Sequence, residues 1–182
     1  MFSMNLLLPF LTIALAGSAL AAPPAVGQIA PDFTLTSLDG RPTKLSSVLA
    51  DGPVVLIVLR GFPGYQCPLC NRQVQDLVQN AEGFAKAGRR VVLVYPGPGA
   101  DVAKRAEEFA ADKKLPAHFT MVLDPDYTFT KQYELRWEAK NETAYPSAFL
   151  LDRTGKITFA KISNSHGGRA SAKELLTAAA PQ

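Results

Sequence analysis

The chain has 182 residues, of which 47% are hydrophobic and 19% are charged, and its formal net charge is +3. A chain of this length predicts one domain with a single substantial core. No run of lysine and arginine forms a basic stripe, and the aromatic residues are spread along the chain rather than interleaved with basic ones. We therefore expect no nucleic-acid binding.

The first 21 residues differ in composition from the remainder. Leu6 to Leu20 is almost wholly apolar, and Ala19-Leu20-Ala21 offers a small-residue cleavage site, although no Lys or Arg precedes the apolar run. This pattern predicts a secretory signal peptide over residues 1–21 and one domain over residues 22–182. The alternative is an uncleaved membrane anchor, for which the apolar run is short. We expect an exported protein, periplasmic or extracellular, with no stable membrane insertion after cleavage.

Apolar patterns predict the elements that precede the cysteines. Phe33 and Leu35 alternate with polar neighbours, as in a half-buried strand, and Asp39-Gly40 is typical of a hairpin turn. We expect a return strand over 41–45, a short helical turn over 46–49 and a buried, continuously apolar strand over 53–59.

Strands and helices alternate after the cysteines. Val74, Leu77 and Val78 recur at helical spacing, which predicts a helix that ends at Gly88. Asp101 is expected to cap a later helix. The remaining elements are expected as strands over 90–95, 118–123, 147–151 and 156–162 and helices over 102–114, 128–135 and 171–180, with a polar loop over 136–144. This order predicts an α/β sandwich.

The only two cysteines lie in Cys67-Pro68-Leu69-Cys70, between the apolar strand and the next helix. Proline suits the first position of a helix, so Cys67 is expected near the N-cap. Free amide donors and the positive end of the helix dipole stabilise a thiolate there. Arg60 and Arg72 flank the pair and are expected to add to that effect. A partly exposed thiol of depressed pKa at a helix start indicates disulfide chemistry.

Three other roles are open for the pair. A disulfide that closes so short a loop removes little chain entropy, which argues against a structural staple. Two inert, buried thiols are the second alternative, although a cysteine beside proline at a helix start is poorly placed for a core. A metal site is the third alternative.

The order of elements, with C-x-x-C at the start of the first long helix, resembles the thioredoxin fold. More narrowly, it resembles the peroxiredoxin-like branch of that superfamily (AhpC/TSA, redoxin). The stretches that carry this resemblance are Gly27-Gln28-Ile29-Ala30-Pro31-Asp32-Phe33, Pro63-x-x-x-Cys67-x-x-Cys70, and Pro146-Ser147-Ala148-Phe149-Leu150-Leu151-Asp152 with Gly155 and Ile157. The resemblance implies a thioredoxin-like three-layer sandwich, in which helices flank a central mixed β-sheet extended by an N-terminal β-hairpin.

The resemblance supports two interpretations of the cysteines. Against the P-x-x-x-T-x-x-C motif of peroxiredoxins, Pro63 matches the proline, Cys67 replaces the threonine, and Cys70 is the cysteine that attacks peroxide. Against the W-C-x-x-C motif of thioredoxins, Cys67 attacks a target disulfide and Cys70 resolves it, while Gln66 replaces the tryptophan.

Pro146 separates these interpretations. Peroxiredoxins have an arginine at this position, which polarises bound peroxide, whereas thioredoxins have a cis proline opposite the cysteines. We therefore expect a cis bond before Pro146, with an ordinary trans proline that opens a strand as the alternative. Thioredoxins also bury an acid on the strand before the cysteines, which this chain lacks. Glu138 and Glu142 are candidate substitutes, although both are expected to be solvated loop charges.

These observations favour dithiol–disulfide exchange, with Cys67 as nucleophile and Cys70 as resolving thiol. The alternative is a thiol peroxidase that forms a sulfenic acid on Cys70 or Cys67. A minor alternative is copper delivery by Cys67, Cys70 and His166, although such proteins usually space their cysteines by three residues. Neither main hypothesis needs a cofactor or a metal.

The expected partners are protein or small-molecule thiols and disulfides, peroxides under the alternative hypothesis, and a reducing or oxidising redox partner. Pro63, Tyr65, Pro68 and Pro146 are expected to shape the site, with a packing role for Tyr65 as the alternative. Trp137 is expected to anchor its loop rather than to line a substrate groove.

Overall fold

A computed structural model of the protein describes residues 22–178, so the expected signal peptide lies outside the described part of the chain. Its strands are β1 (Thr34–Ser37), β2 (Pro42–Lys44), β3 (Val54–Val58), β4 (Arg90–Gly97), β5 (Phe119–Pro125), β6 (Ser147–Leu151) and β7 (Ile157–Ile162). Its helices are α1 (Leu45–Asp51), α2 (Pro68–Gln79), α3 (Ala81–Lys86), α4 (Val102–Ala110), α5 (Thr128–Gln132) and α6 (Ala172–Ala178). Within these residues no helix combines the length and the apolar character that a membrane crossing requires.

The strands form one mixed sheet in the order β2-β1-β5-β4-β3-β6-β7. β3, β4 and β5 run parallel to one another, so the carboxyl ends of these strands meet at one edge. β6 pairs antiparallel with β3, and β7 pairs antiparallel with β6. The hairpin of β1 and β2 joins the sheet through antiparallel pairing of β1 with β5, which confirms the predicted N-terminal extension.

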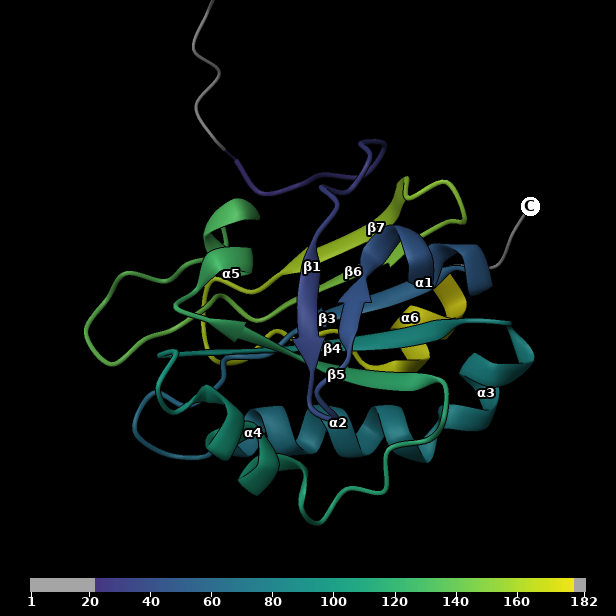
Figure 1. The fold of residues 1–182 in the computed structure, drawn as a ribbon. Coiled ribbons are helices and arrows are strands. Elements are labelled where there is room, and N and C mark those ends of the chain that lie inside the picture. Colours follow the sequence, from purple (N-terminus) through teal and green to yellow (C-terminus); the bar gives the residue numbers. More distant parts are fainter. Residues whose placement is uncertain (1–21, 179–182) are drawn as a thin grey trace, which may run out of the picture.

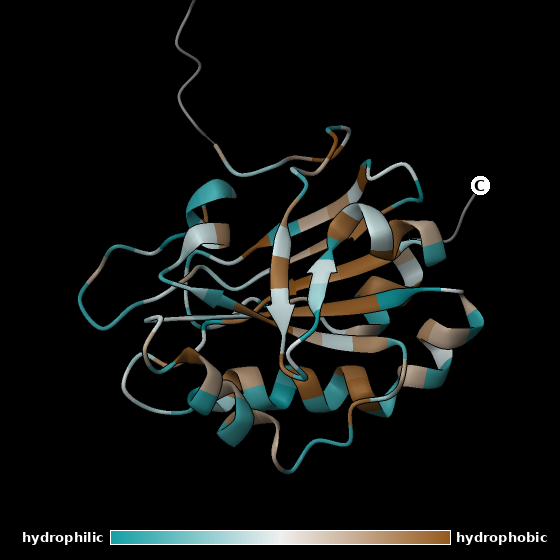
Figure 2. Ribbon diagram, in the orientation of Figure 1, coloured by the Kyte–Doolittle hydropathy of each residue, from teal (hydrophilic) through white to brown (hydrophobic). Residues whose placement is uncertain are grey.

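Helices cover both faces of this sheet (Figure 1). α2, α3, α4 and α6 contribute to a core on one face, where Ile57 of β3 and Leu93 of β4 are fully buried. α1 and α5 contribute to a second core on the other face, around Leu56 and Val92. The continuous apolar run of β3 is explained by burial on both faces. Figure 2 shows the same division, with hydrophobic central strands and polar outer faces on the helices. The predicted thioredoxin-like three-layer sandwich is thereby confirmed.

Three predicted helices are shorter in the structure, and one of them, α5, ends at Gln132 instead of residue 135. The helix after the cysteines breaks at Asn80, which separates α2 from α3, because the Asn80 side-chain amide donates to the Asp76 carbonyl and competes with the helical pattern. α4 ends at Ala110, and the Lys113 ammonium, beyond that end, donates back to the carbonyl of Phe109. Asp101 occupies the N-cap position of α4 without a side-chain hydrogen bond, so its predicted capping role is wrong.

Candidate active site

The loop after β3 leads directly into α2, whose N-cap is Cys67 and whose first residue is Pro68. This confirms the helix-start position predicted for the pair. Cys67 has an extended backbone (φ −68°, ψ 113°), and its Sγ accepts a hydrogen bond from the backbone N–H of Cys70 at 3.4 Å. A sulfur thus takes the place of the side-chain oxygen that usually caps a helix.

Both cysteines are free thiols, and both are buried. Cys67 is 2% exposed and Cys70 is 1% exposed, so the prediction of a partly exposed pair is wrong. The sulfurs lie in the core cluster that α2 shares with α4 and α6. The turn itself is at the surface, because Pro68 and Tyr65 are exposed on either side of Cys67. Reaction with a partner molecule therefore requires a small opening at this turn.

Hydrogen-bond donors surround the sulfur of Cys67. The Cys70 backbone N–H donates to it at 3.4 Å, and Nη2 of Arg169 lies 3.7 Å from it. The hydrogen bond from the Cys70 thiol, supported by the backbone N–H and by the charge of Arg169, lowers the pKa of Cys67 against the opposing effect of burial. Cys67 is therefore the thiol that ionises first.

Cys70 has the opposite preference. Burial raises the pKa of the Cys70 thiol well above its ordinary value, and donation to Cys67 raises it further. The backbone N–H of Arg60 donates to Cys70 Sγ at 3.3 Å and partly offsets this effect. The pair thus combines one thiolate with one thiol, as a nucleophile and a resolving group require.

Arg169 reaches the site from the loop between β7 and α6. Its Nη1 donates to Gln73 Oε1 at 3.2 Å and its Nε donates to the carbonyl of His166 at 3.1 Å, which fixes the guanidinium with Nη2 facing Cys67. The sequence patterns did not single out Arg169, because it lies 102 positions after Cys67 and no local motif marks the contact. Arg72, which was expected to act on the thiols, is exposed on α2 and borders a shallow hollow next to Arg169.

The guanidinium of Arg60 is directed to the 136–144 loop rather than to the sulfurs. It donates to Glu142 Oε2 at 2.6 Å, to the Tyr65 hydroxyl at 2.8 Å and to the Asn141 carbonyl at 3.0 Å. The side chains of Arg60 and Glu142 are 3% and 10% exposed, so the prediction that Glu142 is a solvated loop charge is wrong. The prediction holds for Glu138, whose side chain is 75% exposed.

Gly61, which follows Arg60, is required by close packing. Its φ is +71°, and a Cβ placed on it would lie 1.9 Å from the carbonyl oxygen of Pro96 on β4. A side chain at this position would therefore push apart the carboxyl ends of β3 and β4. This contact is one of those that fix the backbone carrying the donor to Cys70.

The predicted cis bond before Pro146 is wrong, because no peptide bond in residues 22–178 is cis. Pro146 is buried directly before β6, and its carbonyl accepts the backbone N–H of Ser163 at 2.9 Å. The Tyr145 N–H donates to the carbonyl of Leu135. The chain therefore enters β6 as an ordinary trans proline that opens a strand. Of the other residues expected to shape the site, Pro63 is half-buried in the cysteine loop.

Three further residues lie around the 136–144 loop. Tyr65 is 49% exposed, and its hydroxyl contacts Arg60. Trp137 stacks on Tyr145 at 4.9 Å between ring centroids, as expected of a loop anchor. Nε2 of His166 is paired with Glu142 Oε1 at 2.8 Å. Within the described chain no three His, Cys, Asp or Glu side chains gather as a metal site, so Cys67, Cys70 and His166 are not brought together as ligands.

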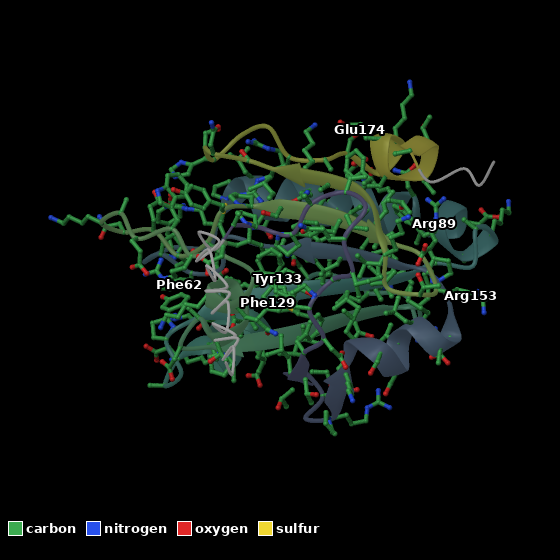
Figure 3. The ribbon with its side chains drawn as sticks, turned by 90° about the horizontal axis from the view of Figure 1, so that it is seen from above. Phe62, Arg89, Phe129, Tyr133, Arg153 and Glu174 are labelled. Atoms are coloured by element: carbon green, nitrogen blue, oxygen red, sulfur yellow. The ribbon has the colours of Figure 1, made fainter. Side chains whose placement is uncertain are left out.

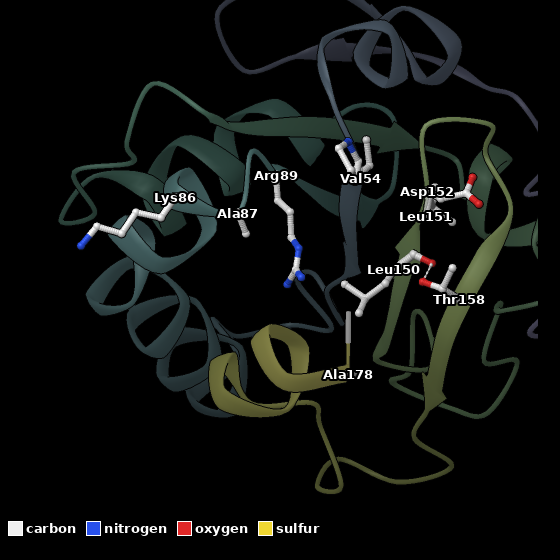
Figure 4. Close-up of a pocket in the computed structure, with 10 residues that line it drawn as sticks. Val54, Lys86, Ala87, Arg89, Leu150, Leu151, Asp152, Thr158 and Ala178 are labelled. Carbon is white, nitrogen blue, oxygen red and sulfur yellow. Dashed lines mark hydrogen bonds between the residues drawn. The ribbon is translucent and has the colours of Figure 1, made fainter. Parts of the chain in front are cut away.

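A separate cavity of about 390 Å³ lies at the start of β3, where Val54, Arg89 and Leu150 line it (Figure 4). The cysteines follow the end of β3, so the length of the strand separates this cavity from the two sulfurs. Figure 3 shows Phe62 of the cysteine loop at one end of the molecule and Arg153, which follows the cavity residue Asp152, at the other. The cavity is therefore not part of the cysteine site.

The sheet, its two helix layers and the cysteine pair at the start of α2 define a thioredoxin-fold protein of the peroxiredoxin-like branch. The model of the AhpC/TSA family matches residues 26–160. The chain belongs to the AhpC/TSA family, as its sequence motifs predicted.

Individual relatives fall into two groups. The chain is 29% identical over 133 residues to chloroplastic peroxiredoxin Q of Oryza sativa subsp. japonica. The aligned region covers 73% of this chain and 57% of that protein. It is 30% identical over 134 residues to thiol-disulfide oxidoreductase ResA of Geobacillus kaustophilus, and the aligned region covers 73% of this chain and 67% of ResA. The names of these relatives thus include both of the reactions that the sequence left open.

Solved structures show the same fold. The crystal structure of peroxidoxin BcpB from Mycobacterium tuberculosis matches with a TM-score of 0.72 and 22% identity, over 84% of this chain and 94% of that one. At this identity the likeness establishes the fold, and the chemistry has to be argued from the cysteine site.

Proposed function

We propose that the chain catalyses dithiol–disulfide exchange, with Cys67 as the attacking thiolate and Cys70 as the resolving thiol. The observation that carries the proposal is the opposite shift of the two thiol pKa values, downward for Cys67 and upward for Cys70. In a peroxidase that used Cys70 as its nucleophile, the shift on Cys70 would have the other sign, because the thiolate is the reacting form.

The exchange proceeds in two balanced steps. The Cys67 thiolate attacks one sulfur of a partner disulfide, forms a mixed disulfide and releases the other sulfur as a thiolate. Cys70 then loses its proton to solvent or to the released thiolate and attacks Cys67 Sγ. This step forms the Cys67–Cys70 disulfide and releases the partner as a dithiol. The backbone N–H of Arg60 favours the Cys70 thiolate in this second step.

Peroxide reduction is the second candidate, and the position of Arg169 favours it. A guanidinium 3.7 Å from Cys67 Sγ is placed where it can polarise a peroxide, a role for which Pro146 supplies no charge. Cys67 would then be oxidised to a sulfenic acid while the peroxide is reduced to water or an alcohol. Cys70 would displace water from the sulfenic acid to form the disulfide.

The test uses reduced protein and its Cys67→Ser and Cys70→Ser variants. We expect Cys70→Ser to accumulate a mixed disulfide on Cys67 when it is mixed with a disulfide-bonded protein, and Cys67→Ser to accumulate none. Stopped-flow mixing with hydrogen peroxide is the parallel experiment. Faster consumption of peroxide than of disulfide, with dependence on Cys67, would replace the proposal by the second candidate.

Export belongs to this proposal, and the composition of residues 1–21 supports it. An oxidising compartment would supply partner disulfides, and a redox partner would return the pair to its starting state. N-terminal sequencing of the exported protein is expected to begin at Ala22. An intact Met1 on exported protein would contradict this part of the proposal.

A further inference from the structure

Glu142 is a buried carboxylate at the centre of a charged cluster. Its side chain is 10% exposed, and it accepts hydrogen bonds from Arg60 Nε at 2.6 Å and from His166 Nε2 at 2.8 Å. Partial burial alone would raise the pKa of Glu142, but the two hydrogen-bonded partners lower it, so the group is ionised at neutral pH. A charge removed from water needs such partners, because hydrogen bonds and opposite charges must replace its lost hydration.

The first partner of Glu142, Arg60, also contacts Cys70. Glu142 and the Asn141 carbonyl hold the guanidinium of Arg60, and the Thr143 hydroxyl donates to the Arg60 carbonyl. Residue 60 is therefore held by both its side chain and its main chain. The N–H of the same residue donates to Cys70 Sγ at 3.3 Å.

The second partner of Glu142, His166, is connected to Cys67 through Arg169. His166 is held by Glu142 through its ring, which also lies against Trp137 at 5.3 Å between centroids. The carbonyl of His166 accepts a hydrogen bond from Arg169 Nε at 3.1 Å. The same guanidinium places Nη2 3.7 Å from Cys67 Sγ. One carboxylate is thus linked to a donor on each of the two sulfurs.

We propose that Glu142 is a positioning residue that holds the Arg60 amide on Cys70 and the Arg169 guanidinium on Cys67, and so sets the reactivity of both thiols. Glu142 acts through Arg60 and His166, and no contact of its own with a sulfur is needed. This proposal goes beyond the proposed function, and only its expected effect on the turnover of a substrate rests on that function. The pKa and the reaction rates of the two thiols can be measured without a physiological substrate.

Positioning and simple charge repulsion predict opposite results. If Glu142 affected the thiols only through its negative charge, its removal would stabilise a nearby thiolate and lower the pKa of Cys67. If Glu142 holds Arg169 in place, its removal frees the guanidinium and raises that pKa. The sign of the change therefore distinguishes the two explanations.

The experiment compares reduced wild-type protein with Glu142→Ala, His166→Ala and the control Glu138→Ala, which removes an exposed carboxylate from the same loop. Thiolate absorbance in the ultraviolet against pH gives the pKa of Cys67. Reaction with dithio-bis-nitrobenzoate gives two phases, because attack by Cys67 releases one nitrothiobenzoate and attack by Cys70 on the mixed disulfide releases the second.

We expect Glu142→Ala to raise the pKa of Cys67 by about one unit and to slow the second phase about threefold or more. His166→Ala removes the ring that anchors the His166 carbonyl beside Arg169 and leaves the Arg60–Glu142 pair, so it is expected to raise the pKa of Cys67. Because the Arg169 charge also lowers the pKa of Cys70, the second phase is expected to slow, but less than in Glu142→Ala. Glu138→Ala is expected to match the wild type in both measurements.

An unchanged or lowered Cys67 pKa in folded Glu142→Ala would overturn the proposal. Should Glu142→Ala fail to fold, His166→Ala decides the Cys67 connection alone, since its side chain is 45% exposed and its loss leaves the Arg60–Glu142 pair intact. An unchanged Cys67 pKa in that variant would overturn the proposal equally. Both readouts report thiol chemistry, so they remain valid if the chain proves to reduce peroxides instead of exchanging disulfides.

Discussion

The surroundings of the two cysteines differ in chemistry although their burial is nearly the same. Cys67 and Cys70 are 2% and 1% exposed, yet their pKa values are shifted in opposite directions. Cys67 lies at the helix N-cap with a backbone N–H and a guanidinium directed at it. Cys70 lies one turn inside, where the charge of Arg169 and the backbone N–H of Arg60 do not offset the desolvation of the core. Hydrogen-bond donors lower the pKa of Cys67 and desolvation raises that of Cys70, so the two effects together decide which thiol reacts.

The largest expected effect comes from removing each of the two sulfurs in turn and comparing the variants. Cys67→Ser is expected to slow the reaction of the protein with a small disulfide at neutral pH by about a hundredfold or more, because the remaining Cys70 thiol is protonated and each pKa unit lowers its thiolate fraction about tenfold. Cys70→Ser is expected to keep the first attack near the wild-type rate. Stopped-flow measurement of both variants checks this, and similar rates for the two would remove the distinction.

A glycine substitution tests the backbone that carries the donor to Cys70. Gly61→Ala is expected to destabilise the protein by about 2–4 kcal/mol, because it combines positive φ with a collision against the Pro96 carbonyl. Gly40→Ala is the matched control, since Gly40 has a φ of +83° and open space around it, and it should cost about 1 kcal/mol. Urea unfolding measures both, and equal losses would show that the packing against Pro96 is unimportant.

Removal of the guanidinium tests the environment of Cys67. Arg169→Ala is expected to raise the pKa of Cys67 by about one unit, because an opposite charge in contact with a thiolate typically lowers its pKa by one unit or more. Arg153→Ala removes the same charge at the other end of the molecule and should leave the pKa unchanged (Figure 3). The pH dependence of alkylation by iodoacetamide gives the pKa of Cys67 in both variants. An unchanged pKa in Arg169→Ala would contradict the role assigned to its guanidinium.

The smallest expected effect is a difference in the pH dependence of stability. In Cys70→Ser the backbone N–H of residue 70 and the charge of Arg169 still lower the pKa of Cys67. The stabilising contribution of Cys67 is therefore full above the unfolded value of about 8.5 and is lost as pH falls through the folded pKa. In Cys67→Ser the remaining Cys70 has a raised pKa, so stability is lost as pH rises above about 8.5. Urea unfolding from pH 6 to pH 10 (roughly two units either side of an ordinary thiol) should give slopes of opposite sign.

Local patterns were sufficient for the fold and for part of the site. Ile57 and its apolar neighbours predicted β3, and Cys67-Pro68 predicted the start of α2, because strand burial and helix capping depend on a few adjacent residues. The break at Asn80 was missed, since a helical apolar pattern continues through it and one side-chain hydrogen bond ends α2.

Predictions that depended on distant contacts were less successful. The exposure of the cysteines, the solvation of Glu142 and the geometry before Pro146 were all predicted wrongly. Arg169 was missed entirely. In each case the deciding partner lies on another element, and the family resemblance around Pro146 indicated the fold correctly while it misled about the bond.

The sequence by itself determined an AhpC/TSA chain whose two cysteines lie at a helix start, because spacing, apolar periodicity and proline placement act over a few residues. Only the tertiary structure decided which sulfur is held as a thiolate. The thiol pKa depends on burial and on charges within a few ångströms, and chain folding brings Arg169 to Cys67 and the Glu142 cluster to Arg60 from positions that the sequence leaves far apart.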